Sequence, residues 1–98
     1  MRIRVVQSGG LAGLRRERVV ETDRLPPERR AALEGLIATA TFFALPERLV
    51  SGLPDVIQYR VEVWESERAH EVAFDDECPN ESLRSLIAGV FDAGMEGS

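Results

Sequence analysis

Four features of this sequence could do chemistry: a single histidine, a single cysteine, an acidic run and a glycine-rich segment. His70 is the only histidine among the 98 residues, so a nucleophile–histidine pair would have to use it. It lies in an alternating, strand-like segment between Ala69 and Glu71, with no sign of an activated base. We therefore interpret His70 as a partly exposed histidine of a strand. One histidine and one cysteine also fall short of the three or four ligands of a zinc site.

The acidic run 75-DDE-77 and the neighbouring Cys78 are the next candidates. The run lacks the spaced D-x-D-x-D-G pattern of a calcium loop. We expect its carboxylates to favour the positive N-terminal end of the helix that follows. A helix start can lower the pKa of a cysteine, but no partner group accompanies Cys78, and we expect it to be inert. These features predict no enzyme, no metal and no cofactor.

The glycine-rich segment 8-SGGLAG-13 holds three glycines around one apolar side chain, Leu11. It does not fit G-x-G-x-x-G, no G-K-[ST] follows, and a strand-like rather than a helical segment comes next, so it is not a phosphate loop. Two interpretations remain open from the residues alone. The simpler is a long hairpin turn that uses positive φ at its glycines. The other is a loop that presents Leu11 to a pocket of a partner.

Hydrophobic periodicity indicates the elements that must position these residues. Period-two alternation predicts strands and a 3.6-residue apolar stripe predicts helices. Asp23 is a candidate cap for the first helix. Residues 47–54 are expected to be a loop. Trp64 is expected either to anchor an interface or to cover the second face of the sheet. The predicted strands are 2–7, 14–22, 55–65 and 69–75, and the predicted helices lie within 23–43 and 76–95. The order ββα–ββα predicts an α+β fold: an antiparallel four-stranded sheet with two helices packed on one face, in one domain over residues 1–98.

Composition limits the partners. The formal net charge of −5 argues against a nucleic-acid partner, since binding phosphates takes a basic face. No apolar run approaches the length of a membrane span, and the start of the chain lacks a signal-peptide pattern. We expect a cytoplasmic protein with no membrane partner, and a monomer.

Five motifs, in this order and spacing, resemble the emfourin family, small protein inhibitors of thermolysin-like (M4) zinc metallopeptidases typified by the inhibitor of protealysin. The motifs are 8-SGGLAG-13, 25-LPPE-28, 42-FFALP-46, 54-PDVIQY-59 and 83-LRSLI-87. The resemblance extends over roughly residues 2 to 91. The chain departs from the family pattern at Leu11, where phenylalanine is frequent, and near Ser85, where proline is frequent.

This resemblance implies an α+β fold and reversible, non-covalent occupation of the active-site cleft of a peptidase. Leu11 on a preformed loop would fill the apolar pocket beyond the scissile bond, and 8-SGGLAG-13 carries no strong zinc ligand. The segment 47-ERLVSGLPD-55 is the second candidate contact region. The residues expected to bind the partner are Ser8, Gly9, Gly10, Leu11, Ala12, Leu53 and Asp55. The alternative is a non-enzymatic interaction or regulatory module with another partner and a purely structural glycine-rich loop.

Overall fold

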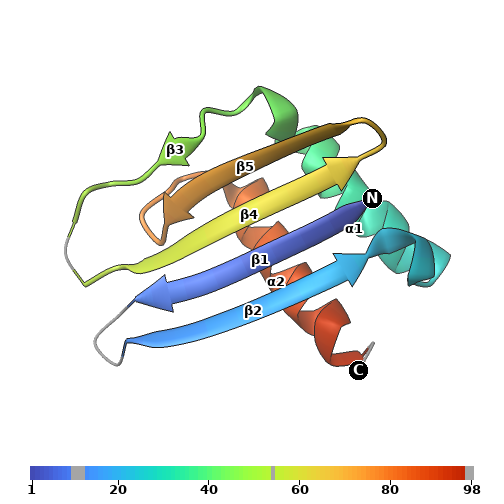
Figure 1. Ribbon diagram of the computed structural model, residues 1–98, viewed down its shortest axis with the longest axis horizontal. Coiled ribbons are helices and arrows are strands. Elements are labelled where there is room, and N and C mark those ends of the chain that lie inside the picture. The colour runs from blue at the N-terminus through green and yellow to red at the C-terminus, as the bar shows by residue number, and fades with distance from the viewer. Residues whose placement is uncertain (10–12, 54, 97–98) are drawn as a thin grey trace.

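A mixed sheet backed by two helices makes up the fold over the residues that the computed structural model describes, which are 1–9, 13–53 and 55–96 (Figure 1). Both helices lie behind the same face of the sheet, as expected. The elements in chain order are β1 (Arg2–Gly9), β2 (Leu14–Glu21), the 3₁₀ helix η1 (Thr22–Arg24), α1 (Pro27–Thr39), the 3₁₀ helix η2 (Phe42–Ala44), β3 (Arg48–Leu49), β4 (Ile57–Glu65), β5 (Arg68–Asp75) and α2 (Glu81–Glu96).

The sheet corrects the predicted topology. Its strand order is β2-β1-β4-β5-β3, and the β1–β2, β1–β4 and β4–β5 pairs are antiparallel. The prediction of four antiparallel strands was wrong because β3, inside the expected loop 47–54, pairs parallel to β5 through Leu49 and Phe74. A two-residue strand is too short to show alternation, and its partner lies far along the chain. The α+β class is confirmed.

The core lies between the sheet and the two helices. Alternation in β1, β4 and β5 directs valine and isoleucine toward the helices, and α2 faces them with its apolar stripe. Fully buried members of this core are Ile3, Val5, Val61, Val63, Val72, Leu83, Leu86 and Val90. The helix-free face carries ion pairs instead, such as Arg4 with Glu17. The sheet therefore has one face in the core and one facing solvent.

The two helix starts have different outcomes. The helix α2 begins within the predicted range 76–95, and Asn80 caps its start: the Asn80 Oδ1 accepts a hydrogen bond from the Leu83 N–H at 3.1 Å. The expected cap by Asp23 is wrong: this residue lies in η1, and α1 begins at Pro27 without a side-chain cap. Two consecutive prolines explain the shift, since the residue before a proline is pushed into extended backbone, which is the conformation of Leu25 and Pro26.

Candidate functional site

The two segments expected to bind a partner meet at one end of the sheet. The strand β1 ends there and β4 begins there, with Ser8 opposite Gln58 and Gly9 opposite Ile57. Figure 1 shows the end of β1 beside the start of β4, and the end of β5 lies at the same end of the sheet. Residues 8–9, 50–53 and 55–57 therefore border one surface, although residues 8–9 lie far from the others in the sequence.

Gly9 sets how closely the two segments approach. Its φ is +94°, a conformation that L side chains rarely adopt. A Cβ at this position would lie 3.0 Å from the main-chain oxygen of Val56. Both observations require glycine, so this residue allows the end of β1 to pass against the segment before β4.

The structure places four of the seven expected contact residues at this end. Ser8 is half-buried, and Gly9, Leu53 and Asp55 are exposed. Leu53 is 52% exposed, the highest value among the large apolar residues that the structure describes. The Asp55 backbone has a φ of +59°. The remaining three, Gly10, Leu11 and Ala12, lie outside the described residues.

A buried carboxylate that the sequence did not indicate holds the segment before β4. Asp75 is 2% exposed, and its Oδ2 accepts hydrogen bonds from the Ser51 N–H at 2.6 Å and the Ser51 hydroxyl at 2.7 Å. Its Oδ1 accepts one from the Glu77 N–H at 3.0 Å. The two Ser51 bonds lower the pKa of this carboxyl, outweighing the effect of its burial. The sequence groups Asp75 with the carboxylates before α2; in the structure its carboxylate bonds Ser51, before β4, as well as Glu77 in the β5–α2 turn.

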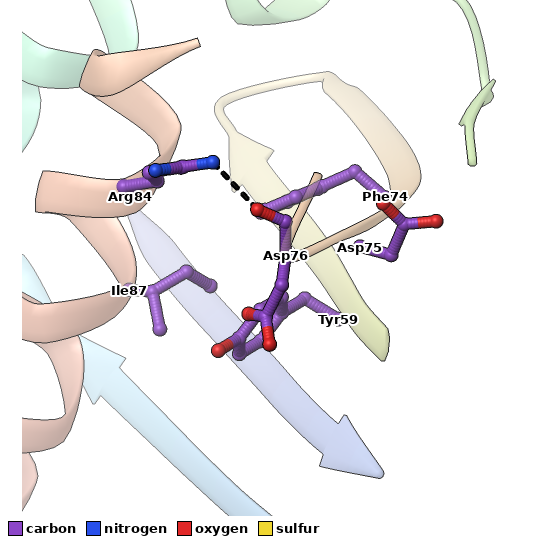
Figure 2. A pocket seen from close by; sticks show the side chains of 6 residues that line it. All are labelled: Tyr59, Phe74, Asp75, Asp76, Arg84 and Ile87. Carbon is purple, nitrogen blue, oxygen red and sulfur yellow. Dashed lines mark hydrogen bonds between the residues drawn. The ribbon is translucent and has the colours of Figure 1, made fainter. Parts of the chain in front are cut away.

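A cavity of about 310 Å³ lies beside Asp75, between the sheet and α2 (Figure 2). Arg84, from the first turns of α2, donates a hydrogen bond to the main-chain oxygen of Asp76 and another to that of Cys78. Burial and the adjacent Asp76 carboxylate raise the pKa of Tyr59. These polar groups are already engaged with their neighbours, and the bonds from Arg84 stabilise the β5–α2 turn beside the cavity.

His70, Cys78 and Trp64, which the sequence analysis singled out, are each partly or fully buried against other parts of the fold. His70 is half-buried, packs against Phe42, and places Nε2 2.7 Å from the main-chain oxygen of Leu45. Because a carbonyl only accepts, this nitrogen is the donor. Cys78 is buried, and Trp64 is half-buried with the Arg2 guanidinium carbon 6.0 Å from its ring centre.

Within residues 1–9, 13–53 and 55–96, no group of three or more histidine, cysteine or acidic side chains could hold a metal ion. Nor does any helix within those residues have the length and apolar character needed to cross a membrane.

Comparison with known proteins identifies the family. The Emfourin family model matches residues 5–90, a range that includes both segments at this end of the sheet. The chain belongs to the Emfourin family. No curated protein and no solved structure matches it. Membership of this family implies a role as a protease inhibitor in general. This role is consistent with the sequence-based prediction that the chain is not an enzyme.

Proposed function

We propose that this emfourin is a reversible, non-covalent inhibitor of a thermolysin-like (M4) zinc metallopeptidase. Residues 8–12 and the segment 47–55 would enter the active-site cleft together. The observation that carries the proposal is that Gly9, in the first of these segments, pairs with Ile57 and closely approaches Val56, directly after the second segment.

The proposed mechanism is pocket filling by preformed loops. A leucine held on a loop loses less conformational freedom on binding than the same residue in a free peptide. Leu11 would occupy the pocket for a bulky apolar residue beyond the scissile bond, and Leu53, exposed on the adjacent loop, would supply a second apolar contact. The segment 8-SGGLAG-13 has no strong zinc ligand, so zinc capture is not needed.

A titration tests the proposal. Increasing amounts of the chain are added to thermolysin-like peptidases, including any encoded beside it, and peptide hydrolysis is followed. Inhibition should saturate and should be relieved by dilution. A matched control is Val19→Ala, since Val19 is also an exposed apolar residue (51%) but lies near the Glu21 end of β2, opposite Arg4. Inhibition equally lost in Val19→Ala and Leu53→Ala would contradict a binding surface at the loops.

The alternative partner class gives a different outcome of the same experiment. A chain that inhibits none of the peptidases but retains a different protein in a pull-down would be an interaction module.

We also propose that the encounter with the peptidase takes place in the cytoplasm, because the inhibitors that this chain resembles are cytoplasmic companions of their peptidases.

A further inference from the structure

A chain of hydrogen bonds connects the buried Asp75 carboxylate to the exposed Leu53. The carboxylate accepts from both the N–H and the hydroxyl of Ser51, and the Ser51 Oγ in turn accepts from the Leu53 N–H at 3.2 Å. Between them, Gly52 has a φ of +79°, which lets the backbone turn within one residue. The conformation of the main chain at Leu53 is thus tied to a charge in the protein interior.

The position of Asp75 in the sheet explains why its side chain reaches this loop. The last β3–β5 pair is Leu49 with Phe74, and Asp75 is the next residue of β5. From there its carboxylate, instead of a main-chain group, accepts the Ser51 N–H. Figure 2 shows this carboxylate directed away from Arg84 and Ile87 of α2. The side chain therefore bonds the loop before β4 with one oxygen and the β5–α2 turn with the other.

The energetics of this arrangement favour a role in binding a partner over a role in stabilising the free protein. Burying a carboxylate is costly unless several donors satisfy it, and here three N–H or O–H groups do so. The two bonds from Ser51, together with the one from the Leu53 N–H to the Ser51 Oγ, hold the backbone at Leu53, a residue with half of its surface in water. Exposure of a large apolar side chain does not stabilise the free protein, whereas a fixed apolar side chain binds a partner at a lower entropy cost.

We infer that Asp75 and Ser51 are positioning residues that present Leu53 to the peptidase. This inference rests on the proposed function and extends it from the contact residues to the groups that hold them. It assigns Leu53 as an anchor prearranged by the fold, in the same cleft as the glycine-rich loop.

The test uses Ser51 variants, because Ser51 is exposed and its replacement keeps the buried charge. Loss of the hydroxyl in Ser51→Ala should weaken inhibition about tenfold, the equivalent of one hydrogen bond to a charged group. Ser51→Thr keeps a hydroxyl and should remain within about twofold. Asp75→Asn should weaken inhibition at least as much as Ser51→Ala, and the matched control is Asp92→Asn on the exposed side of α2.

A double-mutant cycle separates positioning from general destabilisation. If Ser51 acts through Leu53, Ser51→Ala should cost less than about twofold when Leu53→Ala is already present. Hydrogen exchange gives a readout that needs no peptidase: the Leu53 amide should exchange faster in Ser51→Ala than in the parent chain, since its acceptor is gone.

The outcomes are distinguishable. Failure of the parent chain to inhibit any peptidase overturns the proposed function. If the parent chain does inhibit, three results would each overturn this inference alone. The first is undiminished inhibition by Ser51→Ala, and the second is an equal loss from Ser51→Ala with and without the Leu53 side chain. The third is an unchanged exchange rate at the Leu53 amide.

Discussion

Replacement of Gly9 by alanine tests the close approach of the two loops. A left-handed backbone costs an L-residue about 1–2 kcal/mol, and the φ of +94° at Gly9 demands such a backbone. The added Cβ would also lie 3.0 Å from the Val56 oxygen, and relieving such overpacking costs about 1–3 kcal/mol. Together we expect a loss of about 3 kcal/mol, which lowers the Tm of a chain of this length by roughly 12–24 °C.

Two other glycines provide graded controls. Gly13 has a φ of +62° but open space around its Cβ position, so Gly13→Ala should cost only about 1 kcal/mol. Gly35 lies within α1, also with open space, so Gly35→Ala should stabilise the protein by about 0.5–1 kcal/mol. The assay is thermal and urea unfolding followed by circular dichroism. Equal losses for Gly9→Ala and Gly13→Ala would refute the contact with Val56.

Three further predictions concern the loop anchor, the buried carboxylate and the thiol. Leu11→Ala should weaken inhibition more than threefold, about 0.7 kcal/mol; a smaller change in the inhibition constant places the anchor elsewhere. The lowered pKa of Asp75 means that this carboxyl stabilises the fold above its unfolded pKa of about 3.9, and that this stabilisation is lost as the pH falls through the lower folded pKa. Urea unfolding between about pH 5 and about pH 2 measures this contribution. The free energy of unfolding of Asp75→Asn should be lower than that of the parent chain at the higher pH and should fall less on acidification. An equal dependence of the unfolding free energy on pH in both proteins would contradict the role of this group. Cys78, 5% exposed, should react with a thiol reagent much more slowly in the native protein than in urea, and equal rates would show that it is accessible.

Most of the fold follows from local patterns in the sequence. The alternation of 57-IQYRVEVWE-65 separates buried Val61 and Val63 from the polar side of the strand, as the structure confirms. The stripe from Leu83 to Val90 likewise predicts the buried face of α2. In these segments, one period accounts for both the element and its orientation.

What the sequence did not indicate depends on contacts between distant residues. The two residues of β3 become a strand only by pairing with β5, and no local pattern signals that. The Ser51–Asp75 bonds join residues 24 positions apart, so Asp75 read locally was indistinguishable from an acidic residue before a helix. The sequence indicates the segments 8–13 and 47–55 separately, while the register of β1 with β4 places Gly9 opposite Ile57, just after the second segment.

Inhibition by a protein of the Emfourin family is decided by its inhibition constant against a panel of thermolysin-like peptidases, measured for this chain beside Leu53→Ala and the Val19→Ala control. We expect saturable, reversible inhibition of at least one of them, weakened by Leu53→Ala and unchanged by Val19→Ala. Full peptidase activity at saturating concentrations of the folded chain, throughout the panel, would contradict it.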